Sequence, residues 1–317
     1  MYRSDPLWKA LAFPSLMMGI GAVLAGNSSA QVHGNAEFFP ATICLVFVIF
    51  AQLAANCYTR YREVLYSMGY DASLPIRKAN NTTPGYDKAM FYRVFSFGLA
   101  LMSLMAGLTL VSMGGIWFGV VGVFILVCGW LMVGGSTPLL LSPWGSVFTF
   151  ILFGPVTVIS TCLLQSAHEA TDPLSWFDIS PSLFMSGIVG FMCANSYLVY
   201  VYGNYYIYKD TLGDTFTATF GRKATRILVL VNSFLAFGIF VWACFYLKLV
   251  NPLLASSPSV ICLIINIYIW WQMKHLPKYK LSTLAVIASL NVFIMGLVAS
   301  IVAAFVGIPD DSHMQIF

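Results

Sequence analysis

Residues 133–165 read VGGSTPLLLSPWGSVFTFILFGPVTVISTCLLQ: a glycine- and proline-rich opening followed by a continuous apolar run. The run from 145 to 165 contains no Lys, Arg, Asp or Glu, and about 20 apolar residues suffice to cross the roughly 30 Å hydrocarbon core of a bilayer. Gly134-Gly135, Pro138 and Phe153-Gly154-Pro155 each indicate either a helix break or a site of close helix packing. The stretch therefore predicts a membrane-spanning helix preceded by an irregular loop.

The composition of the whole chain extends this prediction. Of 317 residues, 59% are hydrophobic and 9% are charged, and the mean hydropathy is +0.82, whereas about a quarter of the residues in an average soluble domain are charged. The sequence therefore predicts an all-α, polytopic membrane protein. Nine apolar runs have the length of a span: 7–26, 38–57, 91–112, 115–134, 145–165, 182–203, 227–250, 253–273 and 282–307.

The basic residues predict the orientation of these spans, because Lys and Arg in short loops concentrate on the cytoplasmic side. With nine spans and a cytoplasmic N-terminus, fifteen of the sixteen Lys and Arg fall on the cytoplasmic side and only Lys248 falls outside. The C-terminus is then outside, and we expect the membrane to be a bacterial inner (cytoplasmic) membrane. Two long cytoplasmic loops follow from this arrangement, at 58–90 and 204–226.

The domain organisation is expected to be a single unit, residues 1–317, with a possible internal repeat. Each long loop follows an even-numbered span and opens with Asn, Tyr and basic residues, so 7–134 and 145–273 are candidate repeats with a ninth helix at 282–307. Loops that are basic because of topology alone would give the same pattern. The seven cysteines lie in or beside apolar runs without C-x-x-C spacing, which indicates small hydrophobic residues and not metal ligands.

Three stretches resemble the UbiA superfamily of intramembrane aromatic prenyltransferases, in particular its 1,4-dihydroxy-2-naphthoate branch of menaquinone synthesis. They are LAFPSLMMGIGAVLAG with QLAANCY near the first two spans, the stretch at 133–165, and the loop that ends in Phe220-Gly221. The resemblance implies nine transmembrane helices in a ring around a central lipid-accessible cavity. It also implies that the two long loops face each other at the mouth of that cavity. Candidate tyrosines at the mouth are Tyr58, Tyr61, Tyr200, Tyr205 and Tyr208.

The metal-binding motifs of that family are degenerate in this chain. Family enzymes ionise a polyprenyl diphosphate, and two Asp-rich motifs hold Mg²⁺ against it, since hard cations with carboxylate ligands neutralise such a leaving group. Asn56 matches the Asn of the first motif, but the following Asp positions fall on Cys57, on Arg60 and near Val64. In the second motif they fall near Asn204 and Tyr208. The middle loop also departs, with Met132, Leu140 and Ser146 where the branch has Tyr, a basic or small residue, and Glu.

The first hypothesis is therefore a prenyltransferase-like protein that has lost Mg²⁺-dependent transfer and binds lipid, isoprenoid or quinone as a subunit or scaffold of a membrane complex. Arginine can hold phosphate without metal, so no cofactor is expected. No nucleic-acid partner is expected either, whereas a membrane-protein partner is possible. The candidate ligand-binding residues are Asn56, Arg60, Arg62, Asn204, Tyr208 and Lys209.

Two alternatives stay open. An active prenyltransferase of quinone synthesis with a rearranged site would use Mg²⁺ and carboxylates at Asp71, Asp210 and Asp214, with Asp87 as a further candidate. A transporter or channel is disfavoured, because the interiors of the expected spans contain no Lys, Arg, Asp or Glu, and such charges mark most ion pathways. Arginines at a membrane edge, such as Arg60, Arg62 and Arg93, are more often anchors that extend their charged ends into the headgroups than ligand clamps.

Overall fold

The computed structural model describes residues 14–32, 37–67, 86–134, 138–166, 176–205, 215–247, 252–275 and 281–306. These residues form helices and short connections, with no β-strand among them. In chain order the helices are α2 (Pro14–Val32), α3 (Phe38–Ser67), α4 (Tyr86–Gly114), α5 (Ile116–Val133), the 3₁₀ turn η2 (Leu139–Leu141), α6 (Gly145–Ile151), the π-helix η3 (Leu152–Ile159), α7 (Ser160–Ser166), α8 (Trp176–Gly203), α10 (Phe216–Tyr246), α11 (Pro252–His275) and α12 (Leu281–Val306). Since α6, η3 and α7 are continuous, they form one rod.

Six helices in the described ranges are long and apolar enough to cross a membrane. These spans are Phe38–Arg62, Tyr86–Met113, Gly145–Gln165, Ser180–Gly203, Phe216–Tyr246 and Thr283–Ala304, and the apolar part of α5, Phe118–Val133, is shorter. The prediction of an all-helical membrane protein is confirmed. That nine helices cross the membrane, and that the N-terminus is cytoplasmic, stay predictions, as does the internal repeat.

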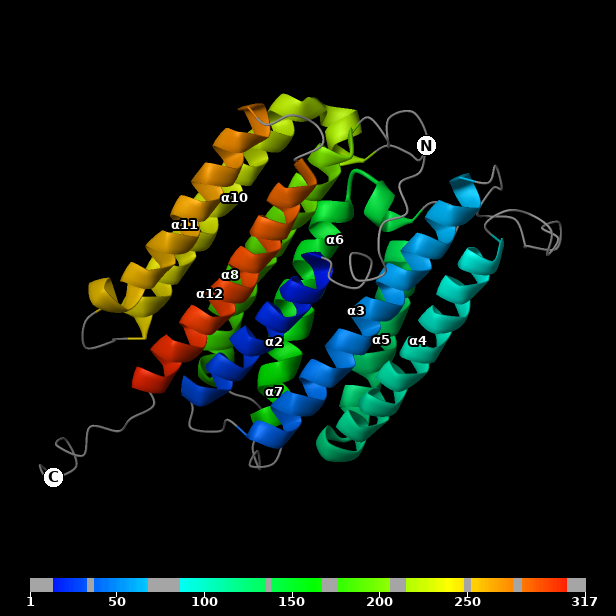
Figure 1. Cartoon of the computed structure of the whole chain (residues 1–317). Helices are drawn as coiled ribbons and strands as arrows, with labels where there is room; N and C mark the ends of the chain where they lie inside the picture. Colours follow the sequence, from blue (N-terminus) through cyan, green and yellow to red (C-terminus); the bar gives the residue numbers. More distant parts are fainter. Residues whose placement is uncertain are drawn as a thin grey trace, which may run out of the picture.

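The helix α8 lies at the centre of the bundle (Figure 1). It packs against α2, η3, α6, α10 and α12, with α10 and α11 on one flank and α3, α4 and α5 on the other. In its most apolar stretch 78% of the residues are buried, the largest share among the six spans, whereas the corresponding share for α4 is 17%. The core of the protein therefore surrounds α8, and α4 presents most of its surface outward.

The crossing of η3 and α8 is unusually close because glycines face each other there. A Cβ atom on Gly154 would lie 2.9 Å from the Cα atom of Gly190, so no larger side chain fits without movement. Pro155 lies within η3, and the hydroxyl of Thr157 donates to the Leu152 carbonyl over 2.7 Å. The sequence Phe153-Gly154-Pro155 thus marks both of the features expected of it, an irregular helix and a close-packing site.

Both long loops are shorter than expected. The helix α3 continues to Ser67 and α4 begins at Tyr86, so the loop predicted at 58–90 is helical at both ends. The loop predicted at 204–226 likewise ends at Thr215, whose hydroxyl caps α10 by accepting from the Ala218 amide. Backbone hydrogen bonding carries a helix past the end of its apolar run, and basic side chains there can reach the headgroups, so hydropathy alone places such boundaries too early.

A kink at Gly221 divides α10. This residue has φ 86° and ψ 163°, inside an otherwise helical segment. Only glycine adopts that conformation readily. The glycine therefore sets the direction in which α10 enters the bundle, and the basic residues that follow it belong to the main part of the helix.

The described Lys and Arg residues gather at one end of the bundle, which we call the basic end. They belong to the last turns of α3 and α11 and the first turns of α4 and α10, which lie together at the top of Figure 1. The eight residues are Arg60, Arg62, Lys88, Arg93, Arg222, Lys223, Arg226 and Lys274. This gathering agrees with the predicted orientation, in which the basic end is cytoplasmic.

Candidate functional site

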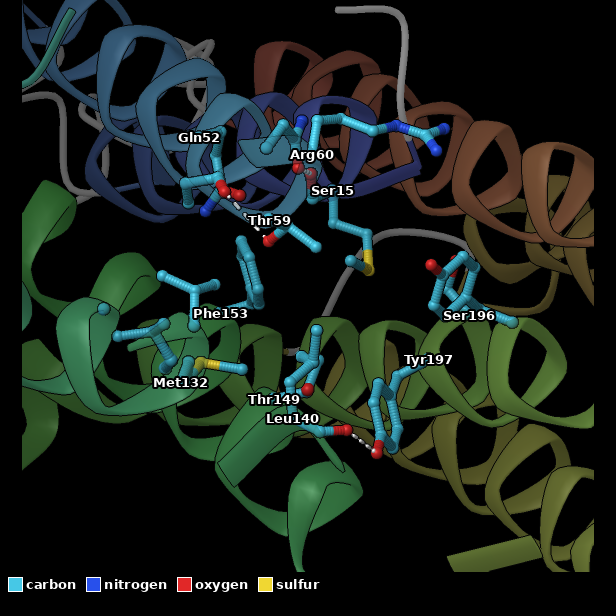
Figure 2. A pocket seen from close by; sticks show the side chains of 17 residues that line it. Ser15, Gln52, Thr59, Arg60, Met132, Leu140, Thr149, Phe153, Ser196 and Tyr197 are labelled. Carbon is cyan, nitrogen blue, oxygen red and sulfur yellow. Dashed lines mark hydrogen bonds between the residues drawn. The ribbon is translucent and has the colours of Figure 1, made fainter. Parts of the chain in front are cut away.

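A cavity opens between α2, α3, α5, η2, the α6–η3 rod and α8, with Arg60 of the basic end on its wall. It encloses about 910 Å³ of empty space, its open mouth included. Most of its lining is apolar, from residues such as Met18, Met132, Leu140, Leu152 and Phe153. We call it the head cavity, and Figure 2 shows it from close by.

One face of α3 supplies the polar wall of the head cavity. Gln52, Asn56, Thr59 and Arg60 follow the spacing that places residues on one side of a helix, and all four line the cavity. The hydroxyl of Ser15 on α2 donates to Oδ1 of Asn56 over 2.9 Å and so fixes the amide. Nδ2 of Asn56 is buried and has no hydrogen-bond partner among the described residues.

The facing wall comes from α8 and the α6 region (Figure 2). Tyr197 donates from its hydroxyl to the carbonyl of Leu140, and this bond joins α8 to the η2 turn. Ser196 is 1% exposed, and its hydroxyl oxygen has no hydrogen-bond partner among the described residues. Buried polar atoms are rarely left unpaired. The unpaired atoms of Asn56 and Ser196 therefore favour a ligand or water with polar atoms in this cavity.

A second cavity, which we call the tail cavity, lies next to the first. It lies between α3, α4, α5 and the η3–α7 segment and encloses about 730 Å³ of empty space, open space included. Its lining is mainly apolar and includes Phe47 and Phe118. Gln52, Leu152 and Phe153 line both cavities. The two therefore adjoin along Phe153, the head cavity with a polar wall and the tail cavity with a mainly apolar lining.

The candidate ligand-binding residues separate in the structure. Asn56 and Arg60 line the head cavity. The Arg62 guanidinium instead donates to the Val133 carbonyl over 2.8 Å and ties α3 to the end of α5. Asn204 donates to the Tyr200 carbonyl within α8 and does not line the cavity. Tyr208 and Lys209 lie outside the described residues.

The prediction that the candidate tyrosines lie at the mouth of the cavity was only partly correct. Tyr200 lines the head cavity, but Tyr58 and Tyr61 contact each other at 5.7 Å between ring centroids and pack in a cluster with α4. They miss the cavity because α3 remains helical there and turns this face toward α4. Tyr205 is described but does not line the cavity.

Cys57 also points away from the head cavity. It is fully buried in a cluster with Ala54 and Leu99, between α3 and α4. Asn56 and Arg60, four residues apart, are thus the positions of the first motif that face the cavity. Among the positions at which this chain departs from the first Asp-rich motif, Arg60 is the one that changes the charge of the cavity wall.

Sequence reasoning missed Ser15, Gln52, Ser196 and Tyr197. Each is a common polar residue inside an apolar run, and each reaches the cavity through helix packing between distant parts of the chain. The position of Gln52, one turn before Asn56, was the available signal, because it extends the polar face of α3 by one turn.

The described cavity residues do not fit a magnesium site. Neither cavity has an Asp or Glu among its lining residues, and the described part of the chain contains no group of three or more His, Cys, Asp or Glu that could hold a metal ion. Mg²⁺ prefers carboxylate oxygens. Asp87 is exposed in the first turn of α4, outside the cavity lining, and Asp71, Asp210 and Asp214 lie outside the described residues.

Two curated proteins that resemble this chain in sequence carry the same name. The chain is 26% identical over 160 residues to a 1,4-dihydroxy-2-naphthoate octaprenyltransferase of Mycobacterium tuberculosis, covering 50% of this chain and 54% of that protein. It is 22% identical over 185 residues to the Bacillus subtilis protein of the same name, covering 58% and 57%. The chain thus matches little more than half the length of either relative. No family model matches it.

Solved structures share the fold over nearly the whole chain. A structure described as a digeranylgeranylglyceryl phosphate synthase in membranes aligns with a TM-score of 0.56 at 15% identity, over 94% of this chain and 99% of that one. A UbiA homolog from Aeropyrum pernix K1 aligns with a TM-score of 0.62 at 13% identity, over 89% and 98%. The chain thus has the fold of these structures, one of them a UbiA homolog, and over about half its length its sequence is similar to proteins named 1,4-dihydroxy-2-naphthoate octaprenyltransferase.

Proposed function

We propose that this protein binds an isoprenoid or quinone-type lipid in its head and tail cavities and does not perform Mg²⁺-dependent prenyl transfer. In this proposal it serves as a lipid-binding subunit or scaffold of a membrane complex in a bacterial inner membrane. The observation that carries the proposal is the position of Arg60. It lines the head cavity where the family resemblance expects a carboxylate that holds metal.

The charge of Arg60 decides between binding and transfer. A diphosphate leaving group carries about three negative charges, and its departure at low dielectric requires cations that stabilise the developing charge. An arginine binds such an anion in the ground state through its N–H groups. It cannot supply the oxygen ligands that two metal ions need. The head cavity is accordingly suited to an anionic or polar headgroup held without turnover.

The shape of the two cavities supports a lipid ligand. Polar side chains are concentrated on α3 and α8 in the head cavity, and the tail cavity beyond Phe153 is mainly apolar. A molecule with one polar end and a long hydrocarbon chain matches that order. Isoprenoids and prenylated quinones have this form, and the octaprenyltransferase names of the relatives favour the same substrate class.

Lipid analysis of the purified full-length protein tests binding. We expect an isoprenoid or quinone-type lipid to be enriched over the bulk membrane extract, and Arg60→Gln to reduce that enrichment if the headgroup is anionic. Arg93→Gln is the matched control, because it removes the same charge from an exposed position on α4 outside both cavities. The proposal would be contradicted if the unaltered protein and both variants carried the same lipids, in the proportions of the bulk membrane extract.

An assay with octaprenyl diphosphate and 1,4-dihydroxy-2-naphthoate tests transfer. We expect no product with or without Mg²⁺. We also expect Arg60→Asp alone to leave the protein inactive, because one carboxylate does not complete a site that also lacks the second motif. The names of the relatives favour the alternative, an active enzyme. Mg²⁺-dependent turnover that falls in Asp71→Asn, Asp210→Asn or Asp214→Asn would establish that alternative.

A further inference from the structure

Two arginines of α10 lie on aromatic rings of two neighbouring helices, away from both cavities. Arg222 and Arg226 are one helical turn apart, just after the kink at Gly221. The Cζ atom of Arg222 is 4.3 Å from the centroid of the Tyr202 ring on α8. The Cζ atom of Arg226 is 5.0 Å from the centroid of a Trp270 ring on α11. Aromatic stacking holds a guanidinium flat against the ring.

Among the described residues, the surroundings of this pair carry a surplus of positive charge. Lys223 lies between the two arginines in sequence, and Lys274 and His275 are in the last turn of α11. The sequences of α10 and α11 contain no Asp or Glu. The carboxylates whose side chains the structure describes, Glu37 and Asp87, precede or begin other helices, on the opposite flank of the bundle.

The pair is also held in a built environment. The hydroxyl of Tyr202 donates to the Met273 carbonyl over 2.6 Å, which fixes its ring between α8 and the end of α11. The Nε atom of Arg226 is buried and has no hydrogen-bond partner among the described residues. An unpaired buried donor on a charged group is costly. An oxygen ligand that reached the edge of this guanidinium would remove that cost.

We propose that Arg222 and Arg226 bind the phosphate of an anionic phospholipid from the adjacent leaflet. Arginine holds phosphate oxygens bidentately, and basic sites between transmembrane helices at the headgroup level suit anionic headgroups. Below the pair, α10 and α11 expose apolar side chains against which acyl chains can lie, among them Ile227, Val231 and Ile264. The site is separate from the head cavity and does not depend on what that cavity binds.

The test measures lipid binding to the full chain in detergent by native mass spectrometry and by thermal shift. We expect phosphatidylglycerol to bind and to raise the melting temperature, whereas phosphatidylcholine and inorganic phosphate have little effect. Arg222→Gln and Arg226→Gln should each weaken phosphatidylglycerol binding about tenfold, as expected for the loss of charge-assisted hydrogen bonds. Arg222→Lys and Arg226→Lys keep the charge and should still weaken binding, because the stacked planar group is lost.

Lys223→Gln is the matched control, since it removes one charge from an exposed neighbour on the same turn. We expect it to change the affinity less than threefold. An equal loss in Lys223→Gln would show general electrostatic attraction and overturn the proposal. Equal stabilisation by inorganic phosphate would overturn the assignment to a lipid. Restored stability of Arg222→Gln or Arg226→Gln on adding Asp210→Asn or Asp214→Asn would show that loop carboxylates, and not lipid, pair with the arginines.

Discussion

The hydroxyl of Ser15 donates a hydrogen bond to Oδ1 of Asn56 across 41 residues of sequence, at the wall of the head cavity. The bond joins α2 to α3, and the amide nitrogen of Asn56 stays buried and without a partner among the described residues. The side chain of Asn56 is thereby held in one orientation before any ligand binds. Such preorganisation favours a ligand that accepts a hydrogen bond from Nδ2.

Ser15→Ala should release this amide. We expect a loss of about 1 kcal/mol in the free energy of unfolding, the usual net value of one hydrogen bond, and weaker retention of the lipid from the head cavity. The measurements are thermal unfolding in detergent and quantification of co-purified lipid. Ser112→Ala is the control, because the Ser112 hydroxyl is exposed and bonds only within its own helix, to Thr109. A Ser15→Ala protein indistinguishable from this control would contradict the role given to the bond.

Phe153 should limit the hydrocarbon chain that the tail cavity admits, because it lines both cavities where they adjoin. If the cavities hold an isoprenoid-type lipid, Phe153→Ala should shift the co-purified chains toward greater length. Phe153→Trp should exclude the longest ones. Phe234→Ala on the outer face of α10 provides the control. Lipid mass spectrometry measures the chain lengths. If neither change at Phe153 alters them, the hydrocarbon chain of the lipid does not lie in the tail cavity.

Tyr197→Phe should disturb the head cavity as well as the fold. It removes the hydroxyl that bonds the Leu140 carbonyl and leaves that acceptor unpaired, at a cost of about 1–3 kcal/mol if the carbonyl remains buried. Tyr202→Phe removes a comparable bond, to the Met273 carbonyl, outside the cavity. We expect both variants to unfold at lower temperature, but only Tyr197→Phe to retain less of the isoprenoid or quinone-type lipid of the head cavity. If Tyr197→Phe retains the normal amount of lipid, the position of the η2 turn is not needed for ligand binding.

Gly154→Ala should destabilise the bundle, since its new methyl group would meet the backbone of α8 at Ser186 and Gly190. We expect a loss of about 1–3 kcal/mol, typical of overpacking, seen as a lower melting temperature in detergent. Gly238→Ala introduces the same group on α10 with no atom within 4 Å. It should be neutral or slightly stabilising. Comparable losses in the two variants would indicate a helix-propensity effect and not the close crossing.

The orientation of the basic end can be tested with reporters. A reporter inserted near Lys78 should be cytoplasmic, and one fused after residue 317 should be active outside the cytoplasm, because the positive-inside bias is strong. The reverse pair of results would overturn the predicted orientation, whereas two reporters on the same side would overturn the nine-span count.

The sequence predicted the helices well and their rotation poorly. The apolar runs correspond to the observed helices because each helix must satisfy its own backbone in the membrane. Arg60 was correctly placed near the site, but Tyr58 and Tyr61 were not, since hydropathy does not tell which side of α3 faces α4. Ser15 and Tyr197 were missed because their partners lie 41 and 57 residues away in the chain.

The position of α8 has a consequence for how the protein is made. It is the least apolar of the six candidate spans and the most buried, and it carries Asn195 and Ser196 near its middle. A translocon partitions each new segment by its own affinity for lipid, so α8 is the span least able to enter the bilayer alone. Its amide finds partners on α10 at Val229 and Ser233, which are synthesised later. The emerging chain must therefore retain α8 beside the earlier helices α2 and α6 until α10 has been synthesised. If the ribosome pauses after α8, we expect more of the protein to be misinserted or degraded.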